Sequence, residues 1–341
     1  MTSARPRLLR SALVLTSSLL VLTACGSDPD DTASGDALVV YVGRDEELVS
    51  PLIEQFTEET GIQVEARYAG TTEHAATLID EGDRTPADVF LSQDAGALGA
   101  LADEGLLREL PADITGAVLP EFTSTDGSWV GITGRARVIA YDGEELSADE
   151  VPGTVATFAE PEWSGRVGFP PGNASFQAFV TAYRVAEGDD AARAWLEGME
   201  SNDLQEYENN VATLTAVDDG ALDIGLINHY YWFRAADEVG AENMRAQLKF
   251  ADPGDPGALV NVTGAGVLSD DPDALAFVEY LISETGQAYF VENTFEYPLV
   301  PGVAAPEGLP PLQDLEGPDI DLSDLADLAA TVTMIEGAGL L

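Results

Sequence analysis

The first third of the chain alternates between short apolar runs and longer amphipathic segments, and this alternation constrains the fold more than any other feature. The short runs have the composition and length of buried strands, and the longer segments carry apolar residues at helical spacing. The predicted strands are residues 37–42, 62–68 and 87–91, and the predicted helices are residues 46–59, 71–81 and 95–104. Gly61 follows the first helix as a C-cap. This order of strands and helices predicts a mostly parallel sheet with helices on both faces.

A second α/β unit follows, and two long strand-like stretches flank it. Its predicted strands are residues 165–169, 204–208 and 221–227, and its predicted helices are residues 176–185, 191–199 and 212–218. The long stretches, 129–141 and 258–268, contain internal glycines, which weaken a strand and favour a bend. Both stretches therefore suit crossings between two domains. Further helices are predicted at residues 272–283, 286–292 and 322–335.

We expect an α/β fold with two lobes, each built on a mostly parallel sheet, joined by two crossing strands with a ligand cleft between the lobes. The first lobe is predicted to contain residues 37–136 and 262–311. The second lobe is predicted to contain residues 137–261 and 312–341. A folded body running from about residue 37 to the end of the chain is long enough for two domains.

The N-terminus has the features of a secretion signal. Three arginines and no acidic residue precede a short apolar run at residues 11–22, which favours a signal peptide over a membrane-spanning helix. The run ends in Leu-Thr-Ala-Cys, which resembles a bacterial lipobox, so Cys25 is predicted to carry a lipid and to become the first residue of the mature protein. Residues 1–24 are then the signal peptide, and the polar, acidic residues 25–36 are a flexible tether. The predicted location is the extracytoplasmic face of the bacterial cell membrane.

The charge of the chain excludes several classes of partner. There are 15 basic and 61 acidic residues, which gives a net charge of −46, and the only lysine is Lys249. Such a surface repels nucleic acid and anionic lipid, and we expect it to form a solvated acidic coat. Cys25 is the only cysteine, so neither an intrachain disulfide nor a cysteine metal site can form.

Two adjacent tyrosines follow a buried strand in the second unit. Residues 224–227 are mostly apolar, Asn228 and His229 form a predicted polar turn, and Tyr230 and Tyr231 come next. The end of a strand in an open α/β sheet is a common position for a binding site. Alternatively, both tyrosines are half-buried packing residues, since a tyrosine has an apolar ring and a polar tip. The pair by itself leaves both interpretations open.

Several motifs resemble those of the ferric-iron-binding proteins, the bacterial transferrin-like family among the solute-binding proteins of ABC importers. These motifs are residues 41–47, 52–56, 59–62, 86–90, 134–138, 226–232 and 295–301. Together they span essentially the whole mature chain, and the Tyr-Tyr-Trp element within residues 226–232 is the most specific. The resemblance implies a type II periplasmic-binding-protein fold and a role in iron transport.

The resemblance further implies that Tyr230 and Tyr231 are ligands of Fe(III). Ferric iron is a small, hard cation that prefers anionic oxygen, and a phenol with an ordinary pKa of about 10 becomes a stable phenolate beside such a cation. Two positions in the first lobe depart from the family pattern, because Asp45 stands in place of a histidine ligand and Gln93 in place of a glutamate ligand. Asp45 is still an oxygen donor, whereas Gln93 is a poor donor for Fe(III) and better suited to hydrogen bonding.

Three other residues are not expected to bind the metal. Phe176 stands where some members of the family have a third tyrosine ligand, and its ring has no donor atom. His229 stands at a position where the family usually has a non-ligand. His74 is predicted to lie on the surface of a helix.

Two phenolates cannot fill six coordination positions, and the family completes the shell with water and a synergistic anion, phosphate or carbonate. The predicted anion-binding residues are Arg135, Asn173, Ser175, Asn209 and Asn228. Asn173 and Ser175 precede a helix, whose free backbone N–H groups attract anions. Simpler roles stay open for these residues, because asparagine and serine are common N-cap residues and Arg135 or Arg137 could pair with the acidic surface.

The leading hypothesis is a monomeric, lipid-anchored receptor that closes two lobes around Fe(III) and an anion and delivers the iron to the permease and ATPase subunits of an ABC importer. A first alternative keeps the fold but binds an organic cation or a phosphonate, such as thiamine, a polyamine or aminoethylphosphonate. An enzyme is disfavoured, because the sequence has no Ser/His/Asp order, no redox cysteine and no phosphate-binding glycine loop. A passive surface or sensory protein is the remaining alternative.

Overall fold

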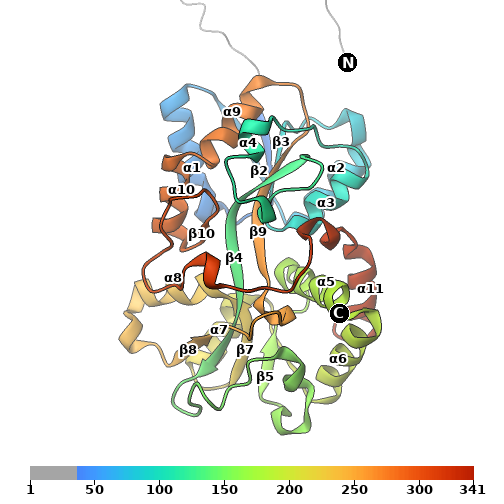
Figure 1. Cartoon of the computed structure of the whole chain (residues 1–341), viewed down its shortest axis with the longest axis vertical. Coiled ribbons are helices and arrows are strands. Elements are labelled where there is room, and N and C mark those ends of the chain that lie inside the picture. The colour runs from blue at the N-terminus through green and yellow to red at the C-terminus, as the bar shows by residue number, and fades with distance from the viewer. Residues whose placement is uncertain (1–36) are drawn as a thin grey trace, which may run out of the picture. The chain divides into compact units, whose positions relative to one another are not determined.

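The computed structural model describes residues 37–341, so the predicted signal peptide, Cys25 and the whole tether lie outside the described residues. The described chain is an α/β structure whose strands join into one mixed sheet (Figure 1). Its apolar side chains form a large core that includes residues of strands near both ends of this sheet. Within residues 37–341, none of the helices has the length and apolar character that a membrane span requires.

The first group of strands and helices comes mainly from the N-terminal part of the described chain. Its strands are β1 (Leu38–Val42), β2 (Val64–Tyr68), β3 (Val89–Ser92) and β10 (Tyr297–Pro298). Its helices are α1 (Glu46–Thr60), α2 (Thr71–Glu81), α3 (Ala95–Asp103), α4 (Ala112–Thr115), α9 (Pro272–Leu281), α10 (Glu284–Tyr289) and the π-helix η7 (Phe290–Thr294). Strand β1 lies between β2 and β3 and pairs in parallel with both, as the alternation of strands and helices predicts. Helix α1 ends at Gly61, whose φ of 80° is accessible to glycine at little cost.

The second group contains the later α/β unit. Its strands are β5 (Val167–Phe169), β6 (Gln205–Glu206), β7 (Ile224–Asn228) and β8 (Ala246–Lys249), and its helices are α5 (Ala174–Glu187), α6 (Asp189–Ser201), α7 (Asn210–Asp218) and α8 (His229–Val239). Strand β5 pairs in parallel with β6 and β7. The ring of Phe176 on α5 stacks on Phe169 of β5, and Trp195 on α6 packs against both rings. Aromatic packing therefore fixes these helices on the sheet.

Two antiparallel strands, β4 (Trp129–Asp142) and β9 (Val260–Val267), join the two groups (Figure 1). The first half of β4 pairs with β9 and β10, and its second half pairs with β7 and β8. The main path through the sheet is therefore β2-β1-β3-β9-β4-β7-β5-β6. The two predicted crossing stretches coincide with β4 and β9. The β4–β9 register shifts between Gly131 and Thr133, an irregularity of the kind that interior glycines favour.

Short 3₁₀ helices occupy many of the connections. They are η1 (Gly82–Arg84), η2 (Pro120–Phe122), η3 (Val155–Ala159), η4 (Pro161–Trp163), η5 (Ala241–Asn243), η6 (Pro256–Ala258), η8 (Leu312–Asp314) and η9 (Leu322–Ala326). The prediction of one continuous helix over residues 322–335 is wrong, because η9 and helix α11 (Leu328–Gly337) are separate elements. Asp327 leaves helical geometry between them, and its carboxylate caps α11 by accepting a hydrogen bond from the backbone N–H of Ala330.

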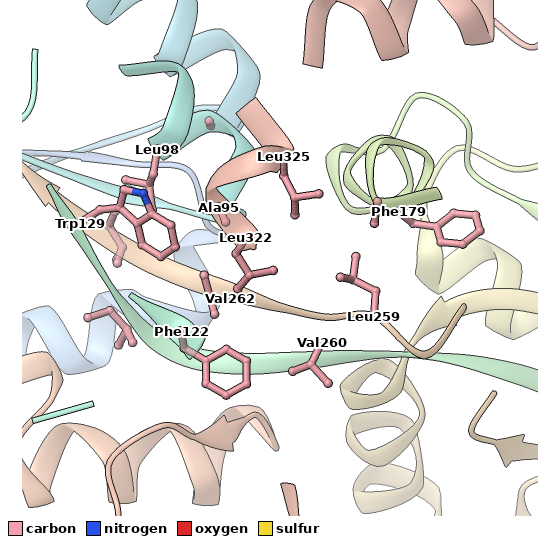
Figure 2. Packing of buried hydrophobic residues seen from close by; sticks show 14 of the residues in the cluster. Ala95, Leu98, Phe122, Trp129, Phe179, Leu259, Val260, Val262, Leu322 and Leu325 are labelled. Atoms are coloured by element: carbon pink, nitrogen blue, oxygen red, sulfur yellow. The ribbon is translucent and has the colours of Figure 1, made fainter. Parts of the chain in front are cut away.

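This C-terminal segment contacts both groups. The helix η9 packs on α3, whereas α11 packs mainly on α5. Figure 2 shows Leu322 and Leu325 of η9 between Leu98 of α3 on one side and Leu259 and Phe179 on the other. The packing against α3 is close, since a Cβ added at Gly96 would lie 2.5 Å from the carbonyl oxygen of Leu325.

We expect Gly96→Ala to lower the free energy of unfolding by about 1–3 kcal/mol, because the added methyl group would push α3 away from η9. Gly337→Ala is the matched control, since Gly337 is also helical and nothing lies within 4 Å of its Cβ position. Because Gly337 is the last residue of α11, the control should gain at most about 0.5 kcal/mol from the higher helix propensity of alanine. Urea unfolding of the two variants measures the difference, and a stabilised Gly96→Ala would contradict the close packing.

Candidate metal centre

The tyrosine pair lies in the first turn of helix α8, directly after the central strand β7. Every residue of β7 is buried, and Asn228 takes the extended geometry of an N-cap (φ −94°, ψ 148°). The predicted polar turn at Asn228 and His229 is therefore wrong, because α8 already starts at His229. Tyr230 and Tyr231 are therefore the second and third residues of this helix, directly after the end of the strand.

The two phenol rings contact each other, with ring centroids 4.2 Å apart and an angle of 30° between their planes. Tyr230 is 1% exposed, and Tyr231 is half-buried. Burial, followed by the charge and hydrogen bond of Tyr230, raises the pKa of Tyr231 well above its ordinary value. The Tyr231 phenol is therefore neutral at physiological pH unless a cation binds and stabilises its phenolate form.

The charge of Asp45 acts on the tyrosine pair, whereas the contact found for Gln93 involves only its backbone. Asp45 is the N-cap residue of α1, its exposed side chain makes no capping hydrogen bond, and its charge contributes to the raised pKa of Tyr231. Its carboxylate is thus available as an oxygen donor. Gln93 follows β3, and its backbone N–H donates to Oγ1 of Thr71 at 2.9 Å.

Two of the predicted anion-binding residues, Asn173 and Asn209, cap helices. Oδ1 of Asn173 accepts hydrogen bonds from the backbone N–H of Ser175 at 3.0 Å and from its hydroxyl at 2.7 Å. Asn209 caps α7 by accepting from the backbone N–H of Ala212 at 2.9 Å. These contacts match the simpler, capping role for Asn173 and Asn209, whereas Ser175 lies in the first turn of α5 and is a donor to the cap residue. Asn228, by contrast, is buried and lies opposite Arg137 in the β4–β7 ladder.

Arg135 and Arg137 are buried on β4, and neither forms an ion pair with a carboxylate of residues 37–341. Arg135 donates from Nη2 to the carbonyl oxygen of Val262 at 3.1 Å, and its Nε and Nη1 have no hydrogen-bond partner among the described residues. Arg137 donates to the carbonyl oxygen of Leu226 at 3.1 Å, and its Nη1 is likewise unpartnered within the described chain. Burial lowers the pKa of Arg137 to about 9. The sequence-based alternative of pairing with the acidic surface is therefore wrong for both arginines.

Neither histidine is free to bind a metal. His229 is fully buried, its Nδ1 accepts from the backbone N–H of Ala136 at 3.1 Å, and its Nε2 donates to the carbonyl oxygen of Phe295 at 2.8 Å. The prediction that His74 lies on the surface is wrong, because it is 6% exposed and its Nε2 hydrogen-bonds the carbonyl oxygen of Arg67 at 2.8 Å. Both imidazoles therefore hold backbone groups together.

Sequence reasoning did not assign a role to a buried ion pair beside the tyrosines. Nη2 of Arg44 lies 2.5 Å from Oε1 of Glu296, and the guanidinium carbon of Arg44 lies 5.8 Å from the ring centroid of Tyr230. Burial lowers the pKa of Arg44, but the charges of Glu296 and the tyrosines outweigh this effect, so the pKa is raised. The sequence did contain one indication that this pair is important. Arg44 lies in motif 41–47 and Glu296 in motif 295–301, and both motifs carry the family resemblance.

No group of three or more His, Cys, Asp or Glu side chains within residues 37–341 is arranged to hold a metal ion. The donors gathered at α8 are phenols, together with the nearby carboxylate of Asp45. This donor set suits a hard, highly charged cation, which prefers anionic oxygen.

The two strand groups, the joining strands β4 and β9 and the phenol pair between them define a solute-binding protein with the type II periplasmic-binding-protein fold, as expected from the sequence. The chain belongs to the family of bacterial extracellular solute-binding proteins, whose model matches residues 84–318.

Individual relatives agree with this assignment along nearly the whole chain. The Fe(3+)-binding periplasmic protein of Serratia marcescens is 34% identical over 334 residues, which cover 97% of each chain. The major ferric iron-binding protein of Neisseria meningitidis serogroup B is 35% identical over 310 residues, 89% of this chain and 93% of that protein. The crystal structure of iron-bound HitA from Pseudomonas aeruginosa has a TM-score of 0.84 at 34% identity and covers 89% of this chain and 99% of its own.

Proposed function

We propose that this protein is the extracytoplasmic receptor of an ABC importer for ferric iron, with Tyr230 and Tyr231 as its central ligands. The observation that carries the proposal is the phenol pair, whose ring centroids lie 4.2 Å apart at the start of α8. Two adjacent phenols supply two anionic oxygens when a trivalent cation displaces their protons. The names of the relatives from Serratia and Neisseria support iron as the solute.

Asp45 is the third proposed donor. It belongs to the first strand group, whereas the tyrosines belong to the second, so a metal bound by all three residues would join the two groups. Gln93 is the weakest candidate, since a neutral amide oxygen adds no charge to offset that of Fe(III). The remaining positions are left for an anion and water.

The proposed anion is phosphate or carbonate, held by Arg135 with help from Asn173, Ser175, Asn209 and Asn228. Nε and Nη1 of Arg135 have no partner within the described part of the chain, which supports this role, because a buried guanidinium without an anionic partner is costly. Asn228 is buried at the start of α8, close in sequence to the tyrosine pair. The capping contacts of Asn173 and Asn209 use only the carbonyl oxygens of their side chains, so their side-chain NH₂ groups are the donors offered to the anion.

The proposed organisation has one lobe of residues 37–136 and 262–311 and another of residues 137–261 and 312–341, which close around the solute by a hinge movement. Cys25 would anchor the monomer to the membrane through its lipid, with residues 25–36 as the tether. The iron would pass to the permease and ATPase subunits. Nothing in this role requires catalysis, which agrees with membership of a solute-binding family.

A visible-absorbance titration of the purified protein with ferric citrate tests the proposal. We expect a ferric–phenolate charge-transfer band that saturates at one iron per protein and that phosphate or bicarbonate alters. A protein that stays colourless would overturn the iron assignment. Tight binding of an organic cation or a phosphonate by such a colourless protein would then support the alternative solute.

A further inference from the structure

The ion pair between Arg44 and Glu296 is the centre of a buried network in the first strand group. The Arg44 side chain is 2% exposed and that of Glu296 is 0% exposed. Nη1 of Arg44 donates to the hydroxyl of Thr263 on β9 at 2.5 Å, and the second carboxylate oxygen of Glu296 accepts from the hydroxyl of Thr133 on β4. Arg44 and Glu296 are 252 positions apart in sequence, and these hydrogen bonds attach the pair to both β4 and β9, the strands that join the two groups.

This network contacts the tyrosine helix at two points. The guanidinium of Arg44 faces the ring of Tyr230, with 5.8 Å between the guanidinium carbon and the ring centroid. On the other side, Nε2 of His229 donates to the carbonyl oxygen of Phe295, the residue before Glu296. The start of α8 is therefore held against the segment that carries the ion pair, and Arg44 is also the residue next to Asp45.

A buried ion pair in this position is difficult to explain by stability alone. Removing two charges from water costs several kcal/mol per ion, and their attraction often does no more than offset that cost. Groups of this kind near metal ligands commonly orient the ligands and adjust the electronic properties of the bound metal. The cation of Arg44 over an electron-rich ring gives a direct route for such an effect.

We propose that Arg44 is a positioning residue for the metal site, held over Tyr230 by Glu296, and that the balance of these two charges sets the electronic energy of the bond between Tyr230 and the metal. This inference rests on the proposed binding of ferric iron by Tyr230. Arg44 need not touch the metal. It acts through the ring that it faces.

The position of the ferric–phenolate absorption band tests the inference, because the band energy depends on the charge near the phenolate. Arg44→Gln removes the positive charge and Glu296→Gln removes the negative charge, so the two variants should shift the band in opposite directions. The double variant should return the band towards its wild-type position. We also expect Arg44→Gln to lower iron affinity about 10- to 100-fold in competition with citrate, as for other outer partners of metal ligands.

Arg67→Gln is the matched control, since the guanidinium carbon of Arg67 lies 5.5 Å from the ring centroid of Tyr41 but its side chain is 42% exposed. This variant should leave both the band and the affinity unchanged. If Arg44→Gln fails to fold, Arg44→Lys and Glu296→Gln carry the test: the first keeps the charge and should keep the band position, and the second should shift it.

A purely structural role would shift the band in the same direction in the Arg44→Gln and Glu296→Gln variants, or in neither, and would overturn the inference. Those outcomes leave the iron proposal intact, because the wild-type band is still present. A wild-type protein without any band overturns the iron proposal and this inference with it.

Discussion

The double variant Tyr230→Phe/Tyr231→Phe is expected to lose the ferric charge-transfer band completely and to lose more than about a hundredfold in iron affinity. Replacement of a residue that only contacts a metal ligand already lowers metal affinity about 10- to 100-fold, and this variant removes two direct ligands. Phenylalanine keeps the ring of each residue, so the contact between the rings and the burial of Tyr230 should be preserved. The loss can then be assigned to the two phenol oxygens.

Tyr297→Phe is the matched control for this experiment. Tyr297 is fully buried, its ring lies 5.0 Å from that of His229, and its hydroxyl has no hydrogen-bond partner within the described chain. Removing this third, nearby phenol should leave the band in place. The assignment of the ligands would be wrong if the double variant kept the band or if the control lost it.

The free energy of unfolding of the metal-free protein is expected to decrease as the pH is lowered, and part of this decrease comes from His229. Burial lowers the pKa of this imidazole to about 4, below the value of about 6.5 expected in the unfolded chain. Between these values the unfolded state binds a proton that the native state does not, so the free energy of unfolding falls as the pH drops from about 6.5 to about 4. From pH 7.5 to pH 5.0 the contribution of His229 is a loss of about 2 kcal/mol, at 1.36 kcal/mol per pKa unit.

Urea unfolding of wild type and His229→Gln at pH 7.5 and pH 5.0 measures this contribution. Both pH values lie above the sequence pI of about 4.1, where the protein keeps its negative charge. Glutamine retains a donor and an acceptor for Phe295 and Ala136 but cannot titrate. The variant should therefore lose about 2 kcal/mol less than wild type between the two pH values, and an equal loss in both would show that His229 stays uncharged in the unfolded state or charges in the native one.

The sequence correctly predicted the helices and strands that are determined by neighbouring residues in the chain. Apolar runs and helical spacing identified nearly every long element, and helix α2 (Thr71–Glu81) matches its predicted bounds. Gly61 ends α1 because glycine adopts a positive φ, a property of the residue itself. The glycines inside residues 129–141 and 258–268 likewise indicated the strands that join the two groups.

Errors arose where distant packing overrides local pattern. His74 has the polarity of a surface residue, yet the ring of Tyr41 and the carbonyl oxygen of Arg67 hold it inside. The polar residues Asn228 and His229 have the pattern of a turn, but His229 accepts a hydrogen bond from Ala136 and donates one to Phe295, and both residues are buried at the start of a helix. The partners of His229 lie 93 and 66 residues away in sequence, beyond the range of any sequence window.

The sequence by itself determined the α/β class and the two joining strands, because periodicity and glycine conformation belong to the residues themselves. Its resemblance to a family then singled out the phenol pair as the candidate metal donors. Only the tertiary structure decided what surrounds those phenols. It occupied both nitrogens of His229, left Nε and Nη1 of Arg135 without a partner among residues 37–341, and placed Arg44 and Glu296 beside Tyr230. The physical reason is that burial and charge pairing depend on which distant segments pack together, and the free energy of a charged group depends on those neighbours.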